Sequence, residues 1–352
     1  MIFCIMNFMN IKKISSMICL SAFVSLTSCD TDIESVGINE PTIEEQNPTM
    51  HTAYLQQLLQ YKQQPHQVVF GWFDNADKQP ASQGQLISAV PDSLDYIVLT
   101  HPDSLSANEL KSMRSLRQEK GTRTLYEINF KQFVERYEAL KQAFSEDPAN
   151  KGKEFKLQLN TFLVDSIQYR LSLADRYGYD GVVMNFSAQL PLYMTPMEQD
   201  YYLALENDVL GLAKDWKERH TDKMLVLSGM PTFIKDKSVL KLASYIIIPA
   251  QSTTNAGALR YLINKAMADD VPTNKFVPMV DLYSLDKADV KTGYWGKTFA
   301  AIGAARVVAM ASEGYQLAGL ALGNINNDYY HAAFTYPVVR QAISIINPSV
   351  KK

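Results

Sequence analysis

The chain has 352 residues, of which 47% are hydrophobic and 20% are charged, and its formal net charge at pH 7 is -3. This length and apolar content are enough for one large core, and α/β barrels of this size occur as single domains. Because acidic and basic residues are nearly balanced, no basic surface is available to neutralise phosphates, and we expect no nucleic-acid partner.

The first 28 residues are typical of a secretion signal rather than of a folded domain. Lys12 and Lys13 precede an apolar run over residues 14–26, which is too short to cross a bilayer. The sequence Leu-Thr-Ser-Cys at residues 26–29 resembles a bacterial lipobox and predicts that Cys29 becomes the lipidated first residue. A plain secretory signal that ends near an unrelated cysteine is the alternative.

Residues 29–48 are predicted to form a flexible tether. They are polar, contain two prolines and few large apolar side chains, and place acidic residues directly after Cys29. This acidic stretch resembles the surface-export signal of lipoproteins in glycan-foraging gut bacteria. We therefore expect an outer-membrane lipoprotein that faces the cell surface, touches the membrane only through its lipid anchor, and folds over residues 49–352.

From residue 49 onward, strand-like and helix-like segments alternate. Short, continuously apolar runs are typical of parallel strands buried on both faces. Such runs fall at residues 67–73, 95–100, 123–127, 180–186, 224–228, 245–248, 276–280 and 317–322. Helical periodicity predicts helices at residues 49–62, 107–120, 130–144, 155–176, 196–219, 255–268, 294–312 and 332–346. Ser104 and Asn255 are the expected N-caps. This alternation predicts a single-domain (β/α)8 TIM barrel, with a doubly wound sheet as the alternative.

The most informative segment is residues 177–187, Tyr-Gly-Tyr-Asp-Gly-Val-Val-Met-Asn-Phe-Ser. Alternate side chains of a strand share a face, so Val183, Asn185 and Ser187 are expected to point into the barrel. The segment resembles the fourth strand of glycoside hydrolase family 18, whose pattern is D-G-x-D-x-D-x-E. The opening Asp-Gly pair matches. Val183 then stands at the first inward Asp, Asn185 at the second, and Ser187 at the Glu that protonates the leaving group.

The resemblance implies a substrate-assisted mechanism that this chain no longer supports. In the family the N-acetyl group of the substrate attacks the anomeric carbon, while the enzyme supplies the Glu and an Asp beside it. A serine hydroxyl cannot replace a carboxylic acid as proton donor, and general acid catalysis contributes roughly 10²–10⁴-fold. The last-strand Trp of the family falls near Leu322 and is also missing. We therefore expect no catalytic residue of the family's kind and a barrel that holds a glycan instead of cutting it.

Candidate glycan-binding residues lie where the predicted strands end, because the active sites of such barrels lie at the C-terminal ends of the strands. Trp72 offers a flat apolar face, and Asn185 offers an amide at the barrel centre. The other candidates are Asp74, Glu127, Gln251, Asp281, Tyr283 and Asn324. Each of them is equally typical of packed core, a helix cap or a loop turn. No His or Cys stands at metal-ligand spacing and no glycine-rich phosphate loop is present, so we expect neither a metal nor a cofactor.

Three functions remain open at this point. The first is a catalytically inactive surface lipoprotein that captures N-acetylglucosamine-containing glycans such as N-glycans, together with other proteins of a glycan-uptake complex. The second is an active endo-β-N-acetylglucosaminidase in which Asp74, Glu127 or Asp281 acts as a displaced acid. The third is a protein-binding barrel that keeps the fold and uses its outer loops.

Overall fold

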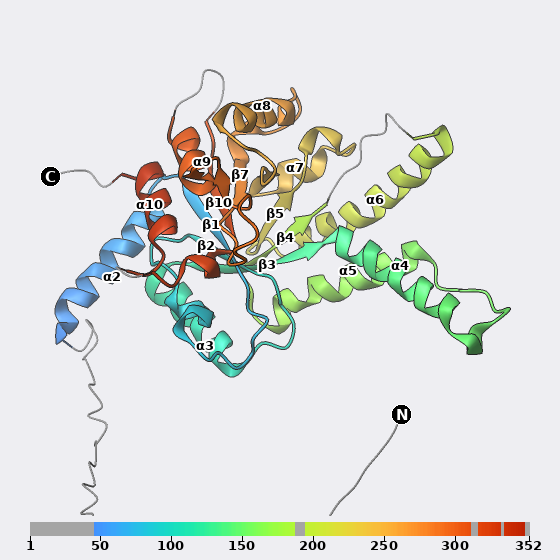
Figure 1. Ribbon diagram of the computed structural model, residues 1–352, viewed down its shortest axis with the longest axis horizontal. Coiled ribbons are helices and arrows are strands. Elements are labelled where there is room, and N and C mark those ends of the chain that lie inside the picture. Colours follow the sequence, from blue (N-terminus) through green and yellow to red (C-terminus); the bar gives the residue numbers. More distant parts are fainter. Residues whose placement is uncertain (1–45, 187–193, 311–315, 332–333, 349–352) are drawn as a thin grey trace, which may run out of the picture. The chain divides into compact units, whose positions relative to one another are not determined.

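The strands of the chain close into one parallel barrel. The structure is a computed structural model that describes residues 46–186, 194–310, 316–331 and 334–348. The strand order around the ring is β1-β10-β7-β6-β5-β4-β3-β2, and Figure 1 shows the strands at the centre with helices around them. The barrel strands are Val68–Phe73 (β1), Tyr96–Leu99 (β2), Arg123–Asn129 (β3), Gly181–Asn185 (β4), Met224–Ser228 (β5), Tyr245–Pro249 (β6), Phe276–Asp281 (β7) and Gly319–Gly323 (β10). The closed ring confirms the predicted TIM barrel and excludes the doubly wound sheet.

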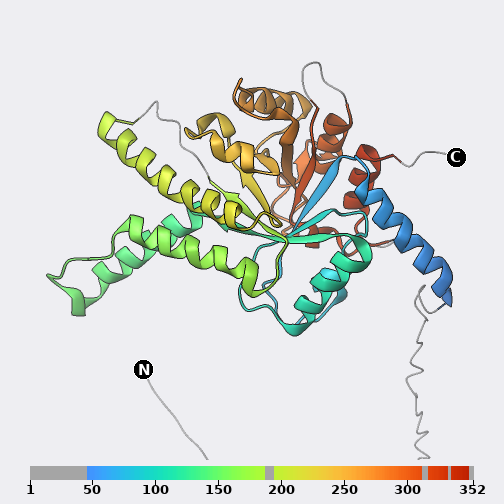
Figure 2. The same ribbon diagram turned by 180° about the vertical axis from the view of Figure 1, so that it is seen from behind.

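Helices follow the strands and cover the outside of the ring, as Figure 2 shows from behind. The helices are Pro48–Gln63 (α2), Ala107–Ser115 (α3), Phe130–Glu146 (α4), Leu159–Arg176 (α5), Pro196–Arg219 (α6), Ser238–Leu242 (α7), Ala256–Ala266 (α8), Ala300–Ala309 (α9) and Pro337–Ile346 (α10). By its internal contacts Thr49–Lys352 forms one unit and Met1–Pro48 another. The expected signal, Cys29, most of the tether and Ser187 lie outside the described residues. Among the helices that are described, none combines the length and apolar character needed to cross a membrane.

Two helix starts follow local capping chemistry, and one of them differs from the prediction. Ser106, and not Ser104, caps α3: its hydroxyl accepts from the backbone N–H of Glu109 at 3.2 Å, and the Glu109 carboxylate accepts from the Ser106 N–H at 2.7 Å. Ser104 has a φ of 55° and lies in the loop before it. Asn255 caps α8 as expected, with its side-chain oxygen accepting from Ala258 N at 2.9 Å.

The helix predicted over residues 294–312 begins later than expected. Tyr294–Trp295 (β8) pairs antiparallel with Thr298–Phe299 (β9), and α9 starts only at Ala300. Glycine at 296, with a φ of 61°, permits the tight turn between these two short strands. Trp295 therefore lies in a hairpin, and its ring packs directly against Gly303 of α9. The final helix likewise starts at Pro337, because proline suits the first helical position.

Buried apolar side chains form two layers, one inside the barrel and one between the strands and the helices. The inner layer consists of Val68, Phe70, Trp72, Val98, Leu125, Val183, Met224, Val226, Ile247, Val277, Met279 and Ala321. Phe70 lies fully buried near its middle and contacts Tyr96 and Tyr245 on one side, with ring centroids 4.4 and 5.4 Å away. The indole of Trp72 lies 6.4 Å away toward the C-terminal ends of the strands. The barrel interior is thus filled with side chains and is not a channel.

The two ends of the barrel sequence are joined by one side chain. Asn347, directly after α10, donates to the carbonyl of Gln67 at 2.7 Å and accepts from the Gln67 N–H at 3.2 Å. Gln67 immediately precedes β1, which pairs with β10 on one side and β2 on the other. The segment after the last helix therefore fixes the backbone where the first strand begins.

Candidate functional site

Three of the predicted site residues meet at the C-terminal end of the barrel. The Glu127 carboxylate on β3 accepts a hydrogen bond from the Trp72 indole N–H on β1 at 3.2 Å and another from the Asn185 amide on β4 at 2.5 Å. The register between β3 and β4 places Glu127 opposite Val183. The Asn185 amide, two residues further along β4, therefore reaches back to meet the acid. The inward face that the alternation predicts for Val183 and Asn185 is confirmed.

The surroundings of Glu127 favour its protonated, neutral form more strongly than water would. Burial raises its pKa above the usual range, and the hydrogen bonds from Asn185 and Trp72 offset part of that rise. An amide at position 185 suits this arrangement because it donates to the carboxylate. An Asp at the same position would place a second carboxylate against Glu127, and one of the two would have to bind a proton. Asn185 and Glu127 therefore form a matched pair.

Val183, which stands where the family has its first inward Asp, lies in the core. Val183 is fully buried within the inner apolar layer of the barrel. A valine offers neither a proton nor a charge, and its side chain has no exposed surface for a ligand. The described part of the fourth strand thus carries no carboxylate of the family motif.

A second, half-buried carboxylate lies at the end of β7. Asp281 pairs in register with Gly323 on β10, and a Cβ added at Gly323 would come within 2.0 Å of an Asp281 carboxylate oxygen. Glycine at this position therefore leaves the space that the acid fills. Burial raises the pKa of Asp281 to about 6. Within the described ranges no side chain or backbone group donates a hydrogen bond to this carboxylate, so its oxygens remain available as acceptors.

Asp74 lies at the exposed rim and organises loop backbone. Its carboxylate accepts from Ala76 N at 2.9 Å and lies 3.2 Å from His101 Nδ1. The Asn326 amide brackets the backbone of Asp74, accepting from its N–H at 2.7 Å and donating to its carbonyl at 3.1 Å. These contacts connect the loop after β1 to the loop after β10 and do not join Asp74 to Glu127.

The remaining predicted residues are spread around the rim. The Tyr283 hydroxyl donates to the buried Asp328 carboxylate at 3.3 Å, and its ring packs against Phe299 with centroids 5.5 Å apart. Burial, followed by the charge of Asp328, raises the pKa of Tyr283 to about 12. Gln251 and Asn324 are exposed in the loops after β6 and β10. In the part of the chain that is described, neither forms a hydrogen bond with Glu127.

Two residues that support this end of the barrel escaped the sequence analysis. Gly323 is one, and the only hint in the sequence is a glycine at the end of an apolar strand. Asn75 is the other: it is 3% exposed and donates to Glu109 Oε1 at 2.7 Å and to the His101 carbonyl at 2.9 Å. This network holds the loop that follows Trp72. The sequence offers one signal for it, a serine at 106 followed three residues later by Glu109, and that pattern predicts a helix start but not a partner on another loop.

No metal-binding arrangement is found across the ranges that the structure covers. Among these residues no group of three or more His, Cys, Asp or Glu side chains is placed to hold an ion. Inside the rim, the described residues offer two half-buried carboxyl groups, one amide and one indole.

Comparisons with known proteins place this geometry in context. The model of glycoside hydrolase family 18, BT1044-like, matches residues 31–345. A selenomethionine Glu-to-Gln variant of BT1044 superposes with a TM-score of 0.57 at 16% identity, covering 88% of this chain and 96% of that one. An endo-β-N-acetylglucosaminidase from Cordyceps militaris gives 0.57 at 18% identity, covering 84% and 96%. Its Asp-to-Asn, Glu-to-Gln double variant, in complex with fucosyl-N-acetylglucosamine-Asn, gives 0.55 at 17% identity with the same coverage. At these identities the likeness shows a shared fold. A comparison with curated proteins gave no match.

Proposed function

This chain belongs to glycoside hydrolase family 18, BT1044-like, and from that premise we propose that its barrel binds an N-acetylglucosamine-containing glycan, such as an N-glycan, without cleaving it. Proteins of similar structure support this ligand class. One similar structure is an endo-β-N-acetylglucosaminidase, and a variant of that protein was crystallised with fucosyl-N-acetylglucosamine-Asn.

The observation that carries the proposal is the loss of the motif carboxylates together with the use made of Asn185. Val183 is apolar and fully buried, position 187 is a serine in the sequence, and the Asn185 amide is engaged with Glu127. A substrate-assisted reaction requires an acid for the leaving group and an Asp for the acetamido group. Neither is present in the motif, so binding is the function that the remaining groups support.

The residues at the mouth have the polarity that a sugar requires. The Asp281 carboxylate can accept from sugar hydroxyls, and the Asn185 side-chain oxygen accepts no hydrogen bond from the described residues and suits an N-acetyl N–H. Trp72 is 5% exposed, so its role in this proposal is to form the floor of the site and orient Glu127. It does not offer a whole ring face to the ligand.

We further propose that the protein acts at the cell surface of its bacterium. The lipobox-like sequence before Cys29, the acidic residues after it and the polar stretch to residue 48 support an outer-membrane lipoprotein on a flexible tether. At the cell surface the protein would capture glycans for uptake as one member of a glycan-uptake complex. Labelling with radioactive palmitate tests the anchor, and a Cys29→Ala variant is expected to lose the label.

The decisive experiment mixes the purified protein with a panel of N-glycoproteins and chitooligosaccharides and reads retained and released glycan by mass. Retention without release is the expected result. Asn185→Ala is expected to weaken retention about tenfold, since one hydrogen bond to the ligand and the orientation of Glu127 are lost together. Asn264→Ala, which changes an exposed amide on α8, serves as the matched control. Absence of retention by the unmodified protein would contradict the proposal.

One observation favours a second function, hydrolysis by a displaced acid. Asp281 has a pKa raised to about 6, and burial also raises the pKa of Glu127. Carboxyl groups that hold a proton near neutral pH are suited to general acid catalysis. If the panel shows enzyme-dependent release, the variants Glu127→Ala, Asp74→Ala and Asp281→Ala identify the acid. Wild-type release by all three variants excludes this mechanism.

A further inference from the structure

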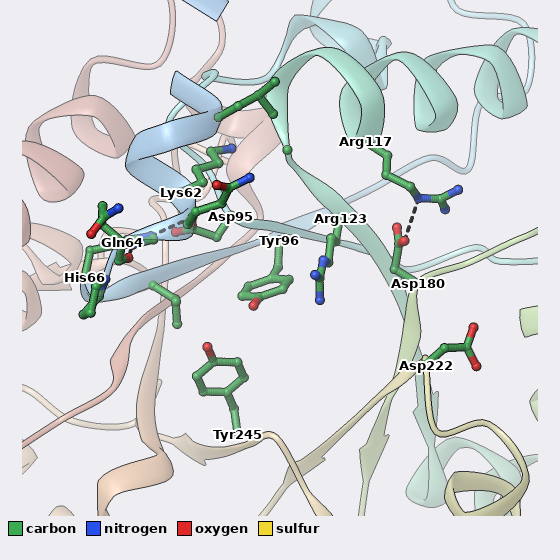
Figure 3. Close-up of a pocket in the computed structure, with 15 residues that line it drawn as sticks. Lys62, Gln64, His66, Asp95, Tyr96, Arg117, Arg123, Asp180, Asp222 and Tyr245 are labelled. Carbon is green, nitrogen blue, oxygen red and sulfur yellow. Dashed lines mark hydrogen bonds and ion pairs between the residues drawn. The ribbon is translucent and has the colours of Figure 1, made fainter. Parts of the chain in front are cut away.

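A cavity of about 580 Å³ lies at the N-terminal end of the barrel, opposite the proposed glycan site (Figure 3). The first residues of several barrel strands line it, together with the end of α2 and the turn that follows α3. The apolar side chains of the inner layer separate it from the C-terminal mouth. No residue of the Glu127 cluster lines this cavity, so a ligand here would occupy a site separate from the proposed glycan site.

Two tyrosines form the floor of the cavity. Tyr96 begins β2 and Tyr245 begins β6, and both rings pack against Phe70 of the inner layer. Their hydroxyls turn toward each other in Figure 3 and form a hydrogen bond. Burial is the main cause that raises the pKa of Tyr96 above its usual range. The floor is therefore rigid and aromatic, with hydroxyl groups at its centre.

Most charged side chains of the cavity wall are already paired. Asp180 lies 2.6 Å from Arg117 Nε and also accepts from the Thr124 N–H at 2.8 Å. Asp95 accepts from His66 Nε2 at 2.9 Å and from the Val69 N–H at 2.8 Å. Each of these carboxylates connects a basic side chain to the start of a strand. They hold the wall together and leave little capacity for a ligand.

Arg123 and Asp222 differ from these pairs. The Arg123 guanidinium is exposed, and its one close polar contact within the described residues is Met224 Sδ at 3.7 Å. Asp222 is exposed and takes part in no ion pair or hydrogen bond with the described part of the chain. Figure 3 shows Arg123 beside Tyr96 and Asp222 on the same side of the cavity. The N–H donors of Arg123 thus remain free beside the aromatic floor, and the carboxylate of Asp222 remains free farther along the same side, beyond Asp180.

We propose that this cavity is a second binding site, and that its ligand is a small, hydroxyl-rich carboxylate such as an acidic monosaccharide. The planar fork of Arg123 fits a carboxylate with two parallel hydrogen bonds. Asp222 accepts only, so it selects hydroxyl groups on the same ligand. The tyrosine rings supply an apolar surface for the face of a sugar ring, and the volume lies within the usual range for small-molecule sites.

Calorimetric titration of the purified protein with D-glucuronate, and with D-glucose as the neutral counterpart, tests the proposal. Glucuronate is expected to bind and glucose is not. Arg123→Gln is expected to weaken glucuronate binding about 10- to 100-fold, the range for a charged hydrogen-bond pair. Arg123→Lys keeps the charge but loses the planar fork, and its affinity for glucuronate is expected to lie between those of the wild type and Arg123→Gln. Arg136→Gln, which removes an exposed arginine on α4, is the matched control.

The same titrations contain the outcomes that overturn the proposal. It fails if glucuronate does not bind, or if Arg123→Gln binds it as tightly as the unmodified protein. Equal affinity for acetate would show that hydroxyl groups play no part and would exclude a sugar acid. Asn185→Ala at the opposite end is expected to leave the titration unchanged, and a change there would move the ligand to the barrel mouth. Circular dichroism of each variant shows whether it is folded.

Discussion

The carboxylates at the two ends of the barrel differ in their partners. At the N-terminal end, Asp95 and Asp180 each meet a basic side chain and a backbone N–H. At the C-terminal end, Glu127 meets only neutral donors, and Asp281 meets none among the described residues. A carboxylate that is paired with a cation and a backbone N–H costs the fold little. A desolvated carboxylate without such partners costs stability and is typical of sites that meet a ligand. This contrast supports the proposed glycan site at the mouth.

The strongest test of the contrast introduces one more charge at the mouth. Val183→Asp restores the acid of the family motif next to Glu127, in a fully buried position. We expect a loss of roughly 3–5 kcal/mol in the free energy of unfolding, measured in urea, because the new carboxylate has no cation to meet. Val290→Asp, at a side chain that is 72% exposed, is the control. If Val183→Asp lost as little unfolding free energy as the control, water would have to reach position 183 despite the burial of Val183.

The second test concerns the space around Asp281. Gly323→Ala places a methyl group where the carboxylate lies and is expected to cost about 1–3 kcal/mol of unfolding free energy. Gly211→Ala on α6, where nothing lies within 4 Å of the added carbon, is expected to be neutral or stabilising. The double variant Gly323→Ala, Asp281→Ala is expected to lose less than the sum of its two single variants. Additive losses would show that the two residues do not share this space.

The third test follows the titration of Asp281. Its folded pKa of about 6 lies above the ordinary value of 3.8, so the folded protein binds an extra proton between these values. The stabilising contribution is complete below about pH 4 and is lost as the pH rises through 6. Relative to the wild type, Asp281→Asn is therefore expected to gain about 2 kcal/mol in unfolding free energy between pH 4 and pH 7. A difference that stays constant over this range would contradict the assignment.

The smallest effect is expected at the N-terminal end, where His66 faces Asp95. The hydrogen bond to Asp95 is the main cause that raises the pKa of His66. The pair stabilises the fold below the unfolded pKa of histidine, and that contribution is lost as the pH rises through the higher folded pKa. After solvent screening we expect about 0.5 kcal/mol between pH 5 and pH 8, from unfolding of the wild type and His66→Gln. A wild-type advantage that grows with pH would reverse the sign of this effect.

The fold was largely predictable because parallel barrel strands are continuously apolar. The runs at 224–228 and 245–248 agree with β5 and β6 to within one residue. The predicted helix starts were wrong where a capping side chain or a tight turn, and not the apolar periodicity, sets the first residue of the helix. Trp295 lies in a hairpin because Gly296 permits the turn, and Ser106 replaces Ser104 as cap because Glu109 stands three residues after it. The helix α7 has five residues, which is too short for a periodic signal.

Three of the eight predicted candidate residues lie in hydrogen-bonding contact with one another, and their pairing could not be predicted from the sequence. Strand alternation and the C-terminal rule selected Trp72, Glu127 and Asn185, which do meet. Which donor reaches which oxygen depends on the register between β3 and β4, and a single sequence does not contain that information. The cavity at the other end was not foreseen, because Arg123, Tyr96 and Tyr245 begin three different strands and look like ordinary strand starts.

The link between Asn347 and Gln67 has a consequence for how the chain is made. The two residues are 280 positions apart, and β1 has one of its two neighbours, β10, almost as far away. The ribosome makes β1 long before β10, so one edge of β1 stays unpaired until residues 319–323 have emerged. The ring can therefore close only after β10 has been made, and a nascent chain truncated before residue 319 is left with two open sheet edges.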